Sequence, residues 1–171
     1  MPTTLARRPL SLAVGLATVL IASLLGFTTP WQPETAHALT AAPSGKSPNF
    51  LAWRVLKIVN KKRVNHGRKP LKMQSCDRHY AKHWGNTLAK NNWWKHSDLW
   101  NLLSDCHMSG AGENLIQFPD GMTPKQIVSA WMHSSGHRAN ILRWGYRLSG
   151  VYFVWDSDQG VWYGVQEFSS R

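Results

Sequence analysis

The sequence is short of acidic residues. Its 171 residues include 9 Asp and Glu against 20 Lys and Arg, for a formal net charge of +11. The shortage is greatest between Arg54 and Lys95, where Asp77 is the single acidic residue among twelve Lys and Arg. A surface of this sign favours polyanions over cationic partners. The alternative interpretation is a solvated basic surface that only keeps the protein soluble.

Long apolar runs are also scarce, and the one that exists lies near the N-terminus. It covers Leu10–Phe27, follows Arg7 and Arg8, and precedes the small-x-small sequence Ala36-His37-Ala38. This order is typical of a secretory signal peptide, which we assign to residues 1–38. The expected location is therefore outside the cell. The alternative is a membrane-anchored protein, because an uncleaved run of this length can nearly span a bilayer.

The chain beyond the signal is short. Residues 39–48 are rich in Pro, Gly and Ser, and we expect them to form a mobile polar linker. Residues 49–171 have the length of one domain with one core, which excludes a second domain. No internal repeat or low-complexity tract occurs. We expect a monomer, and we rank anionic cell-wall polymers, acidic lipid head groups and host glycans ahead of nucleic acid as partners.

Cysteine is rare as well. The chain has 2 cysteines, Cys76 and Cys106. In an exported protein, an even pair favours a disulfide over a metal pair or a catalytic thiol. Closing a loop of this length would stabilise the fold by roughly 3–4 kcal/mol. Two free thiols are the alternative, and they would be labelled by maleimide in the unreduced protein.

Three helices are predicted from apolar spacing and end signals. The first covers Asn49–His66 and ends at Gly67. The second covers Cys76–Lys90, with Ser75 as its N-cap, and the third runs from Thr123-Pro124 to His133. We expect their inward faces to contain Phe50, Trp53, Leu56, Val59 and Val64 in the first helix, Cys76, Tyr80, Trp84 and Leu88 in the second, and Ile127, Val128 and Trp131 in the third.

Strand signals follow the first two helices. Glu113–Phe118 is predicted as a short strand after a turn at Ser109–Gly112, and Trp93–Leu103 is predicted as a loop. Leu148–Trp155 and Val161–Phe168 are predicted as an antiparallel hairpin. Helices followed by a hairpin favour an α+β domain with helices packed on an antiparallel sheet. We also expect most tryptophans beyond the signal to lie in the core.

Three short stretches combine ionisable groups with expected burial: Lys95–Asp98, Gly112–Leu115 and Ser134–Arg138. Each lies where a helix or strand begins or ends, and such positions commonly line clefts. The Gly-x-Ser-x-Gly motif is absent, so a serine nucleophile has little support. His79 and His83 share a helix face but lack the glutamate of a His-Glu-x-x-His motif, so we assign them to the surface.

Several short motifs also stand in a distinctive order. They are Val59-Asn60, Arg63, Pro70-Leu71, His96-Ser97, Gly112-Glu113-Asn114, Trp131, Ser134, Gly136-His137-Arg138, Asn140-Ile141-Leu142, Gly150-Val151 and Phe168. This order resembles the CAP superfamily, whose domain is also called the SCP domain and which includes cysteine-rich secretory proteins and venom allergens. The chain is most similar to the small bacterial secreted members, and the resemblance covers nearly all of Asn49–Ser169.

The resemblance implies a three-layer α-β-α sandwich with a central antiparallel sheet and a large cleft. It places His96, His137 and Glu113 in that cleft. Many eukaryotic members carry a second glutamate three residues after a tryptophan, but counting from Trp131 this chain has Ser134. We therefore expect the acidic pair to be incomplete, and we do not transfer activities that depend on it. Loop support around the cleft is assigned to Ser97, Asn114, Ser134, Arg138 and Asn140.

Histidine chemistry supports a modest metal site. Two imidazoles can bind zinc, but a tightly held catalytic zinc normally has three protein ligands and a water. We expect His96 and His137 to bind zinc or another divalent cation weakly, with Glu113 as a third ligand or as the partner of a metal-bound water. The alternative is that both histidines only form hydrogen bonds in a polar cleft.

The expected protein is therefore a secreted CAP/SCP-domain protein that works by binding. The resemblance implies lipid, sterol or cell-envelope ligands, and the basic residues independently indicate an anionic partner. The first alternative is a metal-assisted hydrolase that acts on peptide or cell-wall material, with Glu113 as the candidate catalytic base. The second alternative is a structural or adhesion module. We favour binding over catalysis.

Overall fold

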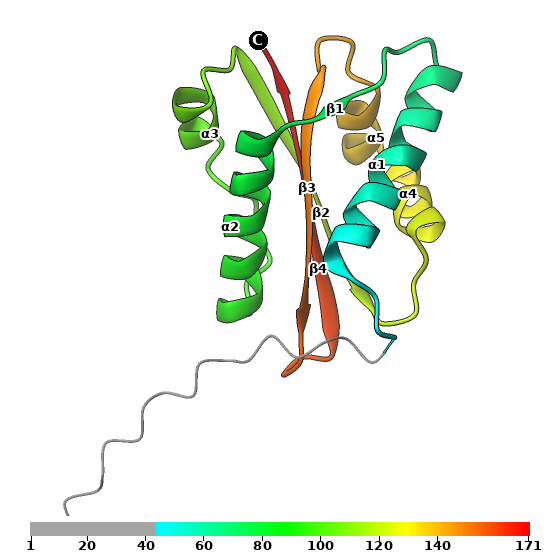
Figure 1. Ribbon diagram of the computed structural model, residues 1–171, viewed down its shortest axis with the longest axis vertical. Helices are drawn as coiled ribbons and strands as arrows, with labels where there is room; N and C mark the ends of the chain where they lie inside the picture. Colours follow the sequence, from blue (N-terminus) through cyan, green and yellow to red (C-terminus); the bar gives the residue numbers. More distant parts are fainter. Residues whose placement is uncertain (1–43) are drawn as a thin grey trace, which may run out of the picture. The chain divides into compact units, whose positions relative to one another are not determined.

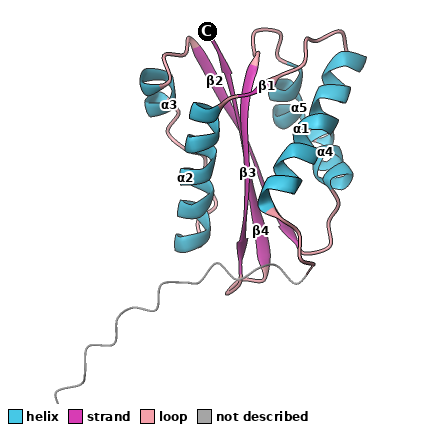
Figure 2. Ribbon diagram, in the orientation of Figure 1, coloured by secondary structure: helices cyan, strands magenta, loops and turns pink. Residues whose placement is uncertain are grey.

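The computed structural model describes residues 44–171 (Figures 1 and 2). The predicted signal peptide, residues 1–38, and residues 39–43 of the predicted linker lie outside the described residues. Residues 44–171 lie in one compact unit, which contains every helix and strand named below. Within that part, no helix is both long enough and apolar enough to cross a bilayer.

Four strands form one sheet in the order β1-β3-β4-β2. The predicted hairpin is confirmed: β3 (Leu148–Asp156) and β4 (Val161–Ser170) pair antiparallel. β2 (Gly110–Pro119) pairs antiparallel with the other side of β4 along its whole length. β1 (Lys72–Met73) adds two residues at the opposite edge, parallel to β3. The sheet is antiparallel, as expected, apart from this short edge strand.

Helices cover both faces of the sheet (Figures 1 and 2). α1 (Pro48–Asn65), α4 (Pro124–His133) and α5 (Ser135–Leu142) lie on one face. α2 (Ser75–Asn91) and α3 (Trp100–Asp105) lie on the other. The predicted three-layer α-β-α sandwich is therefore confirmed.

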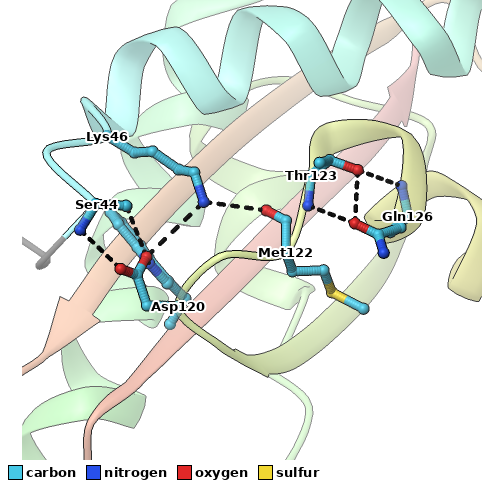
Figure 3. A network of polar contacts seen from close by, with 7 residues as sticks. Ser44, Lys46, Asp120, Met122, Thr123 and Gln126 are labelled. Atoms are coloured by element: carbon cyan, nitrogen blue, oxygen red, sulfur yellow. Dashed lines mark hydrogen bonds and ion pairs between the residues drawn. The ribbon is translucent and has the colours of Figure 1, made fainter.

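Helix ends follow local sequence signals, with one correction. Thr123 caps α4 through a capping box, in which its hydroxyl accepts from the Gln126 N–H and the Gln126 side chain accepts from the Thr123 N–H (Figure 3). Gly67 adopts φ +68 just after α1, as a C-terminal stop requires. The cap of α2 is Gln74, whose side chain accepts from the Asp77 N–H, and not Ser75.

The inward face of α1 differs from the predicted one. Phe50, Trp53 and Val64 are 54%, 54% and 57% exposed. The buried apolar residues are Leu51, Ala52, Val55, Leu56 and Val59. Apolar side chains lie on both sides of this helix, so both sides satisfy a helical period, and the period does not say which side packs on the sheet.

Arg63 also lies on the buried side of α1, fully enclosed. Its guanidinium donates to the backbone carbonyls of Lys69, Ile141, Arg143 and Tyr146 at 2.5–3.2 Å. Burial, with the nearby charges of other arginines, lowers its pKa to about 10, so the side chain still carries its charge at neutral pH. One buried cation thus joins the segments that follow α1 and α5.

Most tryptophans are not in the core, contrary to expectation. Among residues 44–171 only Trp131 and Trp162 are fully buried, each 1% exposed. Five others are large exposed side chains: Trp53, Trp93, Trp94, Trp100 and Trp144.

Three segments predicted as loops or turns are regular. The end of the predicted loop Trp93–Leu103 and the two residues after it form α3, Trp100–Asp105. Residues 110–112 of the predicted turn Ser109–Gly112 are the start of β2. A Cβ at Gly112 would lie 2.4 Å from the Tyr146 hydroxyl, so this glycine serves close packing and not a turn. The predicted turn after α4 is reduced to Ser134, because α5 begins at Ser135.

The predicted disulfide is present. Cys76 and Cys106 are joined with an S–S distance of 2.02 Å and a Cα–Cα distance of 5.9 Å. The bridge ties the first turn of α2 to the residue that ends α3. It therefore closes a loop of the chain that contains α2, α3 and the segment between them, which carries His96.

A polar network attaches the chain before α1 to the β2–α4 turn (Figure 3). Asp120 accepts from the backbone N–H and the hydroxyl of Ser44, both at 2.7 Å, and from the Trp162 indole at 3.0 Å. Lys46 lies 3.8 Å from Asp120 and donates to the Met122 carbonyl. These hydrogen bonds lower the pKa of Asp120 to about 2. Residues 44–46 of the predicted linker thus contact the domain.

Candidate functional site

Glu113 and His96 form the centre of the candidate site. Glu113 lies on β2 and is 5% exposed. One of its oxygens, Oε1, is 2.5 Å from Nδ1 of His96 and accepts from the Ser97 N–H at 3.1 Å. The His96 side chain itself is 64% exposed. Because its Nδ1 is engaged by Glu113, Nε2 is the ring nitrogen left for a ligand.

A second carboxyl group, Glu167, lies beside Glu113. The two residues are cross-strand partners of β2 and β4, so their side chains project from the same face of the sheet. Glu167 is 1% exposed, and burial together with the neighbouring Glu113 raises its pKa well above the ordinary value. Among the described residues, both Glu167 oxygens and Oε2 of Glu113 lack a hydrogen-bond partner. An acidic pair therefore exists, although Ser134 stands where the resemblance would have placed a glutamate.

Sequence reasoning missed Glu167. It lies in the predicted second strand of the hairpin, in the order Val165-Gln166-Glu167-Phe168. A carboxylate inside such an apolar strand was the available signal, since charged residues are seldom fully buried without a partner. Its proximity to Glu113 depends on how β2 pairs with β4, and no local pattern specifies that register.

Glu167 also borders a small hollow of about 150 Å³ on the α2 side of the sheet. Ser97, Tyr80, Trp84 and His83 line it with Glu167. The hollow thus lies between Glu167, the middle of α2 and the segment before α3. A volume of this size suits water or a small ion, because pockets for drug-sized ligands measure roughly 300–1,000 Å³.

His137 approaches the site from the other side of β2. It lies on α5 and is half-buried, and burial, followed by the charge of His96, lowers its pKa. Its backbone carbonyl accepts from the Asn114 side chain at 3.1 Å. Within residues 44–171, however, no three His, Cys, Asp or Glu side chains converge closely enough to hold a metal ion. Of the three predicted ligands, the structure brings His96 and Glu113 into contact.

The predicted support residues contact backbone around Glu113 and α5. The Asn140 side chain donates to the Glu113 carbonyl at 2.9 Å and to Oδ1 of Asn114 at 3.0 Å. Arg138 donates to the Met132 carbonyl at 3.0 Å. Ser134 ends α4 and precedes α5. These contacts hold α5, and with it His137, against β2.

The three-layer fold and the contact between His96 and the buried Glu113 together indicate the family to which the chain belongs. Residues 56–168 match the sequence model of CAP, the cysteine-rich secretory protein family. The match covers more than half of the chain, and the chain belongs to this family.

Known relatives agree with this assignment. The Bacillus subtilis protein YkwD is 29% identical over 149 residues, which are 83% of this chain and 55% of YkwD. The chain thus spans little more than half of that relative. An outer surface protein from Borrelia burgdorferi has the same fold, with a TM-score of 0.66 at 17% identity over 74% of this chain and 96% of the Borrelia chain. An extracellular SCP-domain protein from Bacillus anthracis gives a TM-score of 0.62 at 21% identity, over 72% and 41% of the two chains.

Proposed function

We propose that this CAP-family protein acts outside the cell by binding anionic ligands of the cell envelope. One observation carries the proposal: the positive charge of the domain is not neutralised by its own carboxylates. Residues 44–171 hold 18 Lys and Arg but 8 Asp and Glu, since Arg7, Arg8 and Glu34 account for the others. Within that segment a single Lys or Arg, Lys46, forms an ion pair with a carboxylate.

Burial of acidic residues increases this imbalance at the surface. Asp77, Glu113 and Glu167 are 0%, 5% and 1% exposed, so they place no anionic group at the surface beside the exposed lysines and arginines. A protein surface of one sign raises the local concentration of ligands of the other sign. Anionic wall polymers and acidic lipid head groups are the classes that fit.

Pocket size supports an anionic ligand over the sterols and lipid tails that the family suggests. A sterol or a lipid tail needs an enclosed apolar pocket of roughly 300–1,000 Å³. The hollow beside Glu167 measures about 150 Å³, and a larger, shallow one of about 540 Å³ along α1 is lined by three cations, Arg54, Lys57 and Lys61. Export is supported by the predicted signal peptide and by the similarity to an outer surface protein and an extracellular protein.

The experiment is a salt titration of binding. Residues 35–171 would be titrated against polyphosphate and against vesicles of phosphatidylglycerol and phosphatidylcholine at increasing ionic strength. We expect affinity for both probes to fall steeply, because the Debye length shrinks from about 30 Å at 0.01 M salt to about 8 Å at 0.15 M. No binding to any anionic probe at low salt would refute the proposal.

The contact between His96 and Glu113 favours a second candidate, a weak divalent-metal site that supports hydrolysis. Glu113 orients the imidazole through Nδ1, so Nε2 is free to bind a cation. His137, whose pKa is lowered in part by the charge of His96, would be the second imidazole ligand. A bound divalent ion would supply Lewis acidity. Glu113, with Oε2 unpartnered, would be the base that accepts a proton.

Calorimetric zinc titration tests this site. We expect the wild type to bind weakly and the variants His96→Ala and His137→Ala to bind less, and identical isotherms would remove the site. Turnover of cell-wall fragments and a peptide library, with Glu113→Gln as the control, tests the chemistry. Zinc-dependent turnover that survives Glu113→Gln would remove Glu113 as the base.

A further inference from the structure

The side of α1 that faces away from the sheet has an unusual composition. At about 100° per residue, six side chains fall within an arc of about 100° opposite the buried side. We call this set the outer face of α1; it consists of Phe50, Trp53, Arg54, Lys57, Lys61 and Val64. From Phe50 to Val64, at 1.5 Å per residue, the face is about 21 Å long.

Aromatic and cationic groups are interleaved along this face. The Arg54 guanidinium lies 5.8 Å from the Phe50 ring centroid and 5.9 Å from that of Trp53, and the Lys57 ammonium lies 5.2 Å from Trp53. The three apolar members, Phe50, Trp53 and Val64, are each more than half exposed. No acidic residue occurs in α1.

A shallow hollow of about 540 Å³ runs along the same helix. Arg54, Lys57 and Lys61 line it, together with the apolar side chains of Ile58 and Val64. Within residues 44–171 none of these three cations forms an ion pair with a carboxylate. The lining of the hollow therefore combines three positive charges with apolar side chains.

The apolar members decide which anionic partner fits. A hydrophilic polymer would neutralise the cations but would leave Phe50 and Val64 in water. The headgroup region of a bilayer satisfies both, since phosphates pair with Lys and Arg while Phe, Trp and Val reach the acyl boundary. The alkyl stems of Lys57 and Lys61 can cover the apolar surface between them while their ammonium groups stay hydrated.

We propose that the outer face of α1 docks flat on an anionic phospholipid bilayer. This inference rests on the proposed function in that it takes the ligand to be anionic, and it adds the surface and the partner. The outward side of α2 differs, because it carries the exposed Lys82 and Lys90 but no large exposed apolar side chain. It lies across the sheet from α1 (Figure 1) and supplies matched controls.

The test is flotation of residues 35–171 with vesicles of phosphatidylglycerol and phosphatidylcholine. This unit contains the whole sheet, the disulfide and the described cores, and it omits Leu10–Phe27, which could enter a bilayer by itself. We expect Lys57→Gln with Lys61→Gln to weaken binding about 30-fold, at about fivefold per charge. Lys82→Gln with Lys90→Gln removes the same charge and should weaken binding much less.

The apolar arm compares Trp53→Ala with Trp100→Ala, another exposed tryptophan, which lies on α3. We expect a loss of several-fold for Trp53→Ala and none for Trp100→Ala. All substituted side chains are exposed, and circular dichroism checks that each variant is folded. Vesicles of phosphatidylcholine alone should bind weakly.

Four outcomes would overturn the proposal. Equal losses for the α1 and α2 charge pairs would show diffuse attraction without a docking face. Trp53→Ala without effect, with polyphosphate bound as tightly as vesicles, would make the face a polyanion site. Binding of polyphosphate but not of vesicles would exclude the bilayer while leaving the proposed function intact, whereas no binding to either probe would refute both.

Discussion

Replacing Arg63 with methionine should destabilise the protein severely although the residue is remote from the candidate site. Methionine has a similar volume, so the change removes the charge and the donors without opening a large cavity. The loss leaves the buried Ile141 carbonyl without its Arg63 donor and the Tyr146 carbonyl with the Arg147 side chain as its remaining side-chain donor. Truncating one member of a buried charged network costs about 3–5 kcal/mol. We expect about 3 kcal/mol for Arg63→Met, because the variant also avoids the cost of burying a cation.

Urea unfolding of residues 35–171, followed by tryptophan fluorescence, measures this loss. With a slope of about 2 kcal/mol/M, the expected fall in midpoint is about 1.5 M. The control is Lys62→Met, which removes the same charge from the neighbouring exposed position and should cost under about 0.5 kcal/mol. Arg63→Lys should recover only part of the loss, because one ammonium cannot reach all of these carbonyls. Equal midpoints for Arg63→Met and Lys62→Met would refute this account.

Three further predictions concern buried carboxyls, the N-terminal tether and backbone packing. Because the pKa of Glu167 is raised, the folded protein keeps a proton that the unfolded chain releases near pH 4.5. The free energy of unfolding should therefore fall as pH rises above 4.5, by at most about 1.4 kcal/mol per pH unit. Glu167→Gln should flatten this pH dependence. Urea midpoints that change with pH as steeply in Glu167→Gln as in the wild type would contradict the prediction. The pKa of Asp120 is lowered from its ordinary value near 3.8 to about 2, so its contacts with Ser44 should persist above pH 3.8 and weaken as the pH falls towards 2. Asp120→Asn should speed amide exchange at Ser44 at neutral pH. Protection equal to that of the wild type would argue against the tether. A Cβ at Gly150 would lie 2.2 Å from backbone atoms of α2, whereas a Cβ at Gly136 would have no neighbour within 4 Å. Thermal unfolding should therefore show a loss of several kcal/mol for Gly150→Ala and little change for Gly136→Ala. Similar melting temperatures for the two variants would show that α2 shifts easily.

Local patterns were sufficient where the deciding interactions are close in sequence. The capping box at Thr123 uses residues three positions apart, and the β3–β4 hairpin closes across a short turn. The Cys76–Cys106 bridge followed from an even cysteine count in an apparent export context. The order of motifs from Val59 to Phe168 was specific enough to indicate the CAP family and, through it, the three-layer sandwich.

Patterns failed where two local solutions were equally good. Apolar residues on both sides of α1 satisfied the same helical period, so the exposed Phe50 and Trp53 were assigned to the core. Gly112 suggested a turn, but it lies in a strand where the Tyr146 hydroxyl approaches the backbone. The tryptophans showed the same limit, because hydrophobicity alone does not say which large side chains the available volume can hold.

The sequence by itself thus determined the family, the fold class, the cysteine pairing and the candidate residues His96, Glu113 and His137. Only the tertiary structure decided that Glu167 stands beside Glu113, that His96 leaves Nε2 free, and that α1 turns aromatic and basic side chains outward. The physical reason is common to all three. Strand register and helix rotation are set by the packing of segments that are distant in sequence, so they cannot be predicted from residues that are neighbours along the chain.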